Sequence, residues 1–232
     1  MYKVIMTLAR SGPGNVDRFV IPQFARANGK RTFNLMKIPK DQLEIYFDHG
    51  VDIANRCIFI QGDIGEDTIS AVIKGMYLME NQNSTKDPIE LRICSYGGDV
   101  YDMFALHDVT RTLKSPVHTM GMGKVMSAAV LLVACGERGE RWAGANTSFM
   151  IHVPSWESDY KRQHDHKIDV KESERLWNNW YELMGAYTAK DAAFWRKECN
   201  KRDDVYFDAY TAQKWGVIDH IWDEKAGANS DE

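Results

Sequence analysis

Residues 89–113 have the sequence IELRICSYGGDVYDMFALHDVTRTL, and they join three local patterns in one stretch. The first five residues alternate apolar and polar side chains, which is the period of a half-buried β-strand. The pair Gly97-Gly98 then interrupts the alternation, as glycines do at turns. From Val100 onward, apolar residues recur at helical spacing. The stretch therefore predicts a strand, a glycine turn and an amphipathic helix.

The same succession continues on both sides of this unit. Short apolar runs predict strands at 57–60, 117–120 and 148–151, and periodic segments predict helices at 66–81, 127–135 and 159–187. The segment 127–135 is almost wholly apolar, so we expect its helix to be buried. Strands that alternate with helices along one chain predict an α/β domain.

The two ends of the chain differ from this central part, which we place at 41–223. Residues 1–40 contain several glycines and prolines among basic residues, and we expect an irregular N-terminal arm with one short strand at 4–8. The last residues, 224–232, have the sequence EKAGANSDE. They are small and polar, which predicts a flexible tail.

The composition argues against several classes of protein. The 232 residues carry 29 Lys and Arg against 33 Asp and Glu, a net charge of -4, whereas nucleic-acid binders usually have a basic surplus. The longest apolar run, 125–135, is far shorter than the roughly 20 residues of a membrane-spanning helix. The four cysteines lie far apart, which favours reduced thiols and disfavours a zinc site. We therefore expect a cytoplasmic protein with neither a nucleic-acid nor a membrane partner.

Three local features could carry chemistry. The glycines at 97–98 allow backbone N–H groups to turn toward a ligand. Ser127 begins the buried helix, whose first N–H groups favour a developing oxyanion. His152 follows a predicted strand, where it could act as a base. Each feature also has an ordinary explanation: a turn, a helix N-cap and a packed histidine.

A histidine base needs a nucleophile within hydrogen-bond reach and an acid that orients its ring. Candidate acids lie downstream in residues 201–207, KRDDVYF. This segment contains two neighbouring carboxylates, Asp203 and Asp204.

Together and in this order, these features resemble the ClpP family of serine peptidases. The matching segments are SYGGDVYDMFALHD (95–108), GMGKVMSAAVLLVACGERGERWAGANTSFMIHVP (121–154) and DVYFDAYTAQKWGVIDHIWD (204–223). The resemblance extends over roughly residues 43–222. It implies an α/β fold, a ClpP/crotonase-like spiral of β-β-α units, in which 159–187 forms a long handle helix.

The resemblance also implies a catalytic triad. Ser127 matches the nucleophile, His152 the general base and Asp204 the orienting acid, while Asp203 stays open as an alternative acid. Such a triad hydrolyses a peptide bond through an acyl-enzyme.

The matching oxyanion hole would consist of two backbone N–H groups, those of Gly98 and Ala128. The mechanism requires neither a metal nor an organic cofactor.

Four positions near this site depart from the family pattern. Tyr96 replaces a proline before the tandem glycines, and Ala128-Ala129 replace a Met-Gly pair. Lys124 stands three residues before Ser127, where the family often has glutamine. This lysine suggests an alternative Ser–Lys mechanism, in which Lys124 would be the base.

The expected partners are other copies of the chain, in heptameric or tetradecameric rings, and an AAA+ unfoldase. Glu90 and Arg92 alternate along a strand that, in the family, contributes aromatic residues to the unfoldase pocket, and Thr112 replaces an aromatic on the next helix. Such groups disfavour an apolar docking loop, so we expect a standard unfoldase to bind weakly. The role of residues 1–40 stays open between axial element, pro-segment and docking element. A divergent member encoded by a virus or a mobile element would fit these departures.

Three functions follow as hypotheses. The first is a serine endopeptidase that hydrolyses unfolded polypeptides or peptides inside a ring chamber. The second is a catalytically silent ring subunit that acts as scaffold or regulator. The third is a crotonase-type acyl-CoA enzyme, which would share the fold but would not need Ser127.

Overall fold

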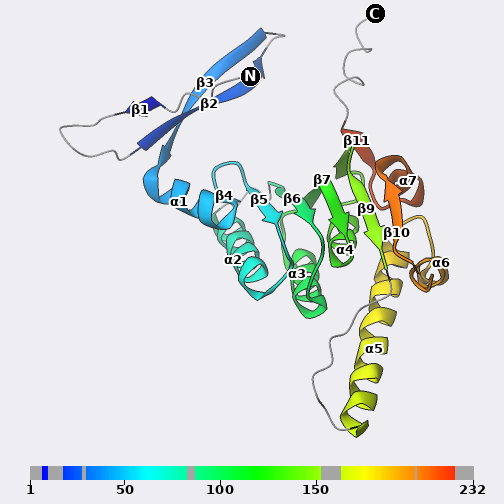
Figure 1. Ribbon diagram of the computed structural model, residues 1–232. Coiled ribbons are helices and arrows are strands. Elements are labelled where there is room, and N and C mark those ends of the chain that lie inside the picture. Colours follow the sequence, from blue (N-terminus) through cyan, green and yellow to red (C-terminus); the bar gives the residue numbers. More distant parts are fainter. Residues whose placement is uncertain are drawn as a thin grey trace, which may run out of the picture.

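A computed structural model describes residues 7–9, 18–27, 30–82, 87–152, 163–201 and 203–222 (Figure 1). The expected tail at 224–232 lies outside these ranges. Within them the chain alternates strands and helices, as the sequence predicts. None of the helices in the described ranges combines the length and the apolarity of a membrane span.

An eight-stranded sheet organises the central part of the chain, with the order β10-β9-β7-β6-β5-β4 and with β8 joining β7 to β11. Its strands are β4 (Val51–Asp52), β5 (Cys57–Gln61), β6 (Ile89–Ser95), β7 (Val117–Met126), β8 (Arg141–Gly144), β9 (Ser148–Ile151), β10 (Val205–Asp208) and β11 (His220–Trp222). The strands β5, β6 and β7 run parallel. Parallel strands need crossover connections, and helices provide them here.

Strand β7 is the branch point of this sheet. Its first half pairs in parallel with β8, with Thr119 opposite Arg141. Its second half pairs in parallel with β9, with Lys124 opposite Ser148. The first half of β7 therefore has β8 as its neighbour, and the second half has β9. The C-terminal end of β7 lies beside the end of β9.

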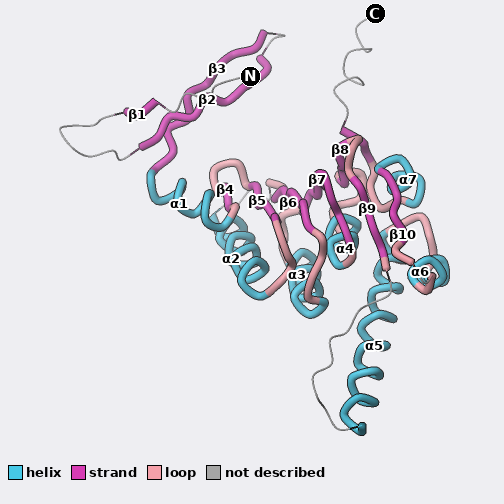
Figure 2. The backbone as a smooth tube through the Cα atoms, viewed as in Figure 1, coloured by secondary structure: helices cyan, strands magenta, loops and turns pink. Residues whose placement is uncertain are grey.

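The helices are α1 (Lys40–His49), α2 (Glu66–Gln82), α3 (Val100–Thr112), α4 (Ala128–Ala134), α5 (Gln163–Tyr187), α6 (Ala192–Cys199) and α7 (Ala209–Trp215). Figure 2 shows the repeated step from strand to helix in β5–α2, β6–α3 and β7–α4. Helix α5 extends away from the sheet as the long handle that the sequence predicts (Figure 1).

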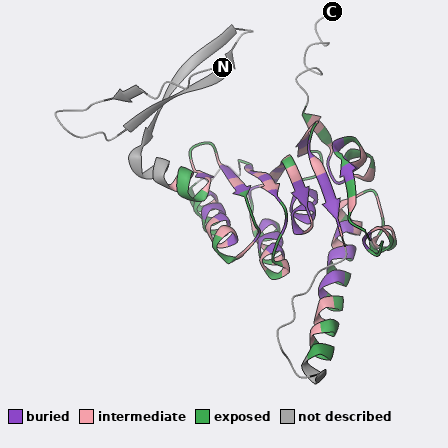
Figure 3. Ribbon diagram, viewed as in Figure 1, coloured by how far each residue is buried: buried purple, intermediate pink, exposed green. Residues whose placement is uncertain are grey.

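The hydrophobic core lies between the sheet and its helices (Figure 3). In β6, Ile89, Leu91 and Ile93 are fully buried while the residues between them are partly exposed, so the period-two pattern is confirmed. Every residue of α4 is buried, as its apolar sequence predicts. The start of α4 is therefore held rigidly inside the domain.

Aromatic side chains of α5, α6 and α7 pack against one another, and they connect the base of the handle helix α5 to the C-terminal part of the chain. Trp180 of α5 and Trp195 of α6 lie edge to face with ring centroids 6.1 Å apart. Trp195 contacts Trp215 of α7 in the same way at 5.7 Å. Because such pairs add to the apolar area that they bury, this cluster stabilises the sheet edge that includes β10.

The N-terminal arm differs from the expectation. Instead of an irregular segment with one strand at 4–8, it contains a three-stranded sheet of β1 (Thr7–Ala9), β2 (Arg18–Ala27) and β3 (Lys30–Pro39). Strands β2 and β3 form an antiparallel hairpin in which Ala27 pairs with Lys30. The expectation of an irregular arm was wrong. The glycines and prolines of this segment indicate breaks, but the Asn-Gly dipeptide in the sequence at 28–29 is also a strong hairpin signal.

A buried arginine connects three elements of the domain. The Arg141 guanidinium donates to both carboxylate oxygens of Asp219, at 2.8 and 2.6 Å. It also donates to the carbonyls of Ala134 at the end of α4 and Tyr187 at the end of α5. Asp219 accepts a further hydrogen bond from the N–H of Gly139. The guanidinium thus finds its partners inside the protein, which a buried charge requires.

Replacing Asp219 by asparagine should lower the free energy of unfolding by about 3 kcal/mol at neutral pH, because Arg141 would stay buried without a counter-ion. Burial alone would raise the pKa of Asp219, but hydrogen bonds and charge from Arg141, with N–H groups of Gly139 and Arg141, bring this pKa below its usual value. The carboxylate therefore stabilises the fold above its unfolded pKa, and this contribution is lost as the pH falls through the lower folded pKa.

Urea unfolding of the wild type and of Asp219→Asn at neutral and at strongly acidic pH measures this effect. The difference between the two proteins should shrink on acidification. A difference that stays constant would show that the carboxylate charge contributes nothing.

Candidate active site

Ser127 occupies a strained turn between β7 and α4. Its backbone has φ 53° and ψ -122°, a conformation that residues other than glycine rarely adopt. Such strain costs on the order of 1–3 kcal/mol and is concentrated at functional sites. The Ser127 N–H donates to the carbonyl of Met150 at 2.8 Å, while its side chain makes no capping hydrogen bond to α4. Ser127 thus stands at the N-cap position of α4, but its hydroxyl does not supply the capping hydrogen bond.

The Ser127 side chain is bound by a histidine instead. Oγ of Ser127 lies 2.8 Å from Nε2 of His152, which is partly buried. The two residues directly follow β7 and β9, and the parallel pairing of Met126 with Met150 brings these strand ends side by side. The structure thus unites two residues that are 25 positions apart, at the distance needed between a nucleophile and a base.

The candidate acid approaches this pair along β10. Strand β10 is antiparallel to β9 with Val205 opposite Ile151, and the same register continued by one residue sets Asp204 opposite His152. Asp203 is one residue further from β10, which begins at Val205. Within the described part of the chain, Asp204 is exposed and makes no hydrogen bond to His152. The serine and histidine are therefore in contact, and the acid is not.

The two glycines are required by close packing against the site. Gly97 has φ +102°, and a Cβ there would lie only 2.7 Å from Cβ of Ser127. Gly98 has φ +148°, and its Cβ would lie 2.1 Å from the carbonyl oxygen of Ile64. These approaches exclude any side chain at either position, so the glycines do more than form a turn.

Backbone hydrogen bonds hold this glycine loop in place. The Ile64 N–H donates to the Gly97 carbonyl at 2.8 Å, and the Asp99 N–H donates to the Ile64 carbonyl at 2.7 Å. The N–H of Gly98, which lies between them, takes part in neither bond. Ala128 is the first residue of α4, where an N–H has no acceptor within the helix. Both expected oxyanion donors thus belong to segments that meet at Ser127.

Lys124 is engaged away from the serine. Its ammonium nitrogen lies 3.6 Å from the centroid of the Tyr96 ring, a cation–π contact. The Ser127 hydroxyl pairs with His152. This arrangement does not support the Ser–Lys alternative.

The expected unfoldase surface is a cavity of about 540 Å³ in which Glu90 and Arg92 are lining residues. Two hydrogen bonds of 2.9 and 3.0 Å join the Arg92 guanidinium to the Glu90 carboxylate. The rest of the described lining includes Met120, Trp142 and Trp222. The described lining therefore mixes apolar side chains with polar and charged ones, which include Arg56 and His118 besides the Glu90–Arg92 ion pair.

Thr112 does not share this cavity. It lies at the end of α3, where its hydroxyl donates to the Val109 carbonyl at 2.9 Å, and it is not among the described lining residues. The expectation that Glu90, Arg92 and Thr112 together alter an unfoldase docking surface stays a prediction.

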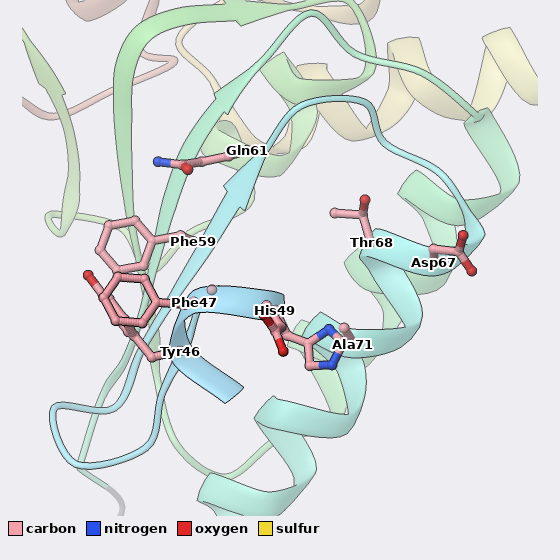
Figure 4. Close-up of a pocket in the computed structure, with 10 residues that line it drawn as sticks. Tyr46, Phe47, His49, Phe59, Gln61, Asp67, Thr68 and Ala71 are labelled. Atoms are coloured by element: carbon pink, nitrogen blue, oxygen red, sulfur yellow. The ribbon is translucent and has the colours of Figure 1, made fainter. Parts of the chain in front are cut away.

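A second cavity of about 550 Å³ lies between α1, β5 and α2 (Figure 4). Phe59 in its wall lies edge to face with Tyr46 at 5.9 Å, and the Arg92 guanidinium lies 5.5 Å from the centroid of the same ring. This aromatic ring thus connects the second cavity to the ion pair of the first. The described lining of the second cavity contains neither Ser127 nor His152.

Two comparisons with known proteins agree with this architecture. The family model described as Clp protease matches residues 46–225. A relative from Bifidobacterium longum (strain NCC 2705), the ATP-dependent Clp protease proteolytic subunit 1, is 24% identical over 213 residues, which cover 92% of this chain and 85% of the relative. The α/β fold inferred from the resemblance is confirmed, and this chain belongs to the Clp protease family.

Proposed function

We propose that this chain is a serine endopeptidase that cleaves peptide bonds through an acyl-enzyme. The observation that carries the proposal is the 2.8 Å contact between Oγ of Ser127 and Nε2 of His152 at a strained turn. A hydroxyl bound to an imidazole and free of a capping role is suited to nucleophilic attack. Membership of the Clp protease family supports the same reaction.

In the proposed mechanism, His152 removes the Ser127 hydroxyl proton as the oxygen attacks the peptide carbonyl. The carbonyl oxygen becomes an oxyanion, which accepts hydrogen bonds from the N–H groups of Gly98 and Ala128. His152 then donates the proton to the leaving amine. A water molecule, activated by the same imidazole, releases the acid product and restores the serine.

Asp204 is the proposed third member of the triad. Its position opposite His152 in the continued β9–β10 register supports this role over that of Asp203. A carboxylate there would fix the imidazole tautomer and stabilise the imidazolium that forms during attack. Since Asp204 and His152 are not hydrogen-bonded in the single described chain, we propose that assembly or substrate binding brings them together.

The proposed active form is a ring chamber, either heptameric or tetradecameric, in the cytoplasm. Ile168 and Val170 of the handle α5 are 54% and 57% exposed, and a second ring could cover these apolar side chains. All four cysteines are free, which accords with a reducing compartment. Substrates would be unfolded polypeptides or peptides that are able to enter the chamber.

A silent ring subunit is the alternative function. It would not need the serine and the histidine at hydrogen-bond distance, so the observed pair counts against it. The acyl-CoA alternative likewise gives no role to a strained serine.

Labelling with a fluorophosphonate probe tests the proposed function. The probe reacts with activated serines, so a purified ring-sized assembly should be labelled at Ser127. A well-formed assembly that stays unlabelled, alone and with substrate peptide, would contradict the proposal and favour the silent subunit.

A standard Clp unfoldase should bind the wild-type assembly weakly, because an apolar docking loop would have to desolvate the Glu90–Arg92 ion pair. Replacing both residues with leucine should raise the apparent affinity about tenfold, since apolar substitutes for a desolvated ion pair are often stabilising. The measurement is ATP-dependent degradation of a folded reporter at increasing unfoldase concentration.

Thr112→Val is the matched control for this experiment. It removes a polar group outside the cavity and should leave the affinity unchanged. Tight binding of the unfoldase to the unaltered assembly would contradict the prediction.

A further inference from the structure

Two side chains at the rim of the candidate active site have no role in the proposed mechanism. Tyr96 follows β6, and its ring is 61% exposed. Lys124 lies near the end of β7 and is partly buried. Its ammonium nitrogen is 3.6 Å from the centre of the tyrosine ring. The ring therefore restricts where the positive charge can lie.

Both residues flank the nucleophile. Tyr96 immediately precedes Gly97, where an added Cβ would collide with Ser127. In the β6–β7 pairing, Ser95 lies opposite Val125, which sets Tyr96 beside the last residue of β7. Tyr96 is thus next in sequence to the glycine that packs against Ser127, and the Lys124 ammonium lies on its ring, so we expect a bound polypeptide to pass near both.

No carboxylate in the described part of the chain neutralises the Lys124 charge. Among the residues that the structure describes, Lys124 forms no ion pair, and its one contact of this kind is the ring of Tyr96. A cation–π contact at an exposed site is weaker than a charge-assisted hydrogen bond to a carboxylate. An acidic group that arrives with the substrate can therefore add to the contact or replace it.

Lys124 is also placed unsuitably for a base. A base must lie within hydrogen-bond reach of the proton that it removes. The Ser127 hydroxyl already pairs with His152, whereas the lysine nitrogen lies on an aromatic face. A role in substrate selection, by contrast, requires only that the Lys124 ammonium stays beside the Tyr96 ring.

We propose that Lys124, oriented by the Tyr96 ring, selects substrates that carry an acidic side chain within two residues of the scissile bond. The inference rests on the proposed peptidase function. Its chemistry is the pairing of one ammonium with one substrate carboxylate at the edge of the site. A substrate with glutamine in place of glutamate keeps its shape and loses this interaction.

The test uses the full-length assembly and internally quenched peptides in matched Glu and Gln pairs, with the substituted residue at each position from two before to two after the scissile bond. At one of these positions kcat/KM should be about fivefold higher for the Glu peptide, as expected for a partly exposed ion pair. This ratio should fall toward one at about 0.5 M salt, because salt screens such pairs.

Variants of Lys124 connect the preference to this residue. Lys124→Met should bring the Glu/Gln ratio close to one, and Lys124→Glu should reverse it, so that lysine peptides become the better substrates. Tyr96→Leu removes the ring that orients the ammonium and should reduce the ratio without reversing it. The matched control is Lys190→Met, because Lys190 lies 5.1 Å over the Phe194 ring, between α5 and α6, and should leave the ratio unchanged.

Each outcome bears on a different claim. Equal rates for every Glu and Gln pair, in an assembly that the fluorophosphonate labels, would overturn the selectivity and leave the peptidase function standing. A Lys124→Met variant that slows both peptides alike and keeps their ratio would overturn it as well. An unlabelled wild-type assembly would instead overturn the proposed function on which the inference rests.

Discussion

Ser127→Ala should lower the rate of peptide hydrolysis by at least about 10,000-fold, as expected when the nucleophile of a serine peptidase is removed. The substitution deletes only the Oγ atom that His152 contacts at 2.8 Å. It keeps the Cβ atom against which the Gly97 backbone packs, so the turn should keep its shape. Cleavage of internally quenched peptides and fluorophosphonate labelling, measured on one sample, should both disappear.

Two controls accompany this experiment. Sedimentation of the variant should give the same particle size as the wild type, because the hydroxyl that is removed contacts His152 of its own chain. Ser70→Ala changes a partly buried serine of α2, outside the site, and should leave hydrolysis unchanged. Hydrolysis by Ser127→Ala within tenfold of the wild-type rate would remove this serine from the mechanism.

Much of the fold could be predicted because local patterns and tertiary burial agree. The alternation along β6 is recovered as alternating burial of Ile89, Leu91 and Ile93. The apolar segment that begins at Ala128 is a fully buried helix. In such elements the periodicity of apolar residues is enough to predict the structure, because the same residues determine both the secondary structure and the packing against the core.

Part of the candidate site could be predicted for a different reason. Ser127 and His152 each follow a strand, and the ends of parallel strands meet at one edge of a sheet. The strain at Ser127 could not be foreseen, because a positive φ outside glycine depends on packing around the turn. The close approach of Gly97 to this serine is likewise a tertiary contact with no sequence signal.

Other features could not be inferred because they depend on how distant segments meet. Thr112 lies outside the described lining of the cavity that contains Glu90 and Arg92, although all three depart from the family pattern. Glu90 and Arg92 are two residues apart on one face of β6 and form an ion pair. The apolar–polar alternation of the sequence predicts that they share a face, but it does not predict the hydrogen bonds between them. The position of Lys124 over Tyr96 is a further example.

Asp204→Asn should lower kcat by about 1,000-fold or more, because the amide cannot hold the histidine in the tautomer that accepts the serine proton. Asp203→Asn is the matched control and should change kcat by less than about threefold, since successive residues of an extended strand point to opposite faces. The register supports this order: Val205 pairs with Ile151, and one further step brings Asp204 to His152. Steady-state kinetics on both variants, with particle size recorded, provides the measurement.

The exposed position of Asp204 makes the same pair of variants informative about assembly. In the single described chain its carboxylate makes no hydrogen bond to His152, and we propose that the contact forms when the particle assembles or when substrate binds. Dilution that dissociates the particle should therefore slow fluorophosphonate labelling of the wild type much more than that of Asp204→Asn, which has no such contact to lose. If Asp203→Asn is the inactive variant, the β9–β10 pairing, which the structure describes as far as Val205, does not continue to Asp204, and Asp203 is the orienting acid. If neither variant is impaired, His152 works without an orienting carboxylate from this segment, and the catalytic site is a dyad.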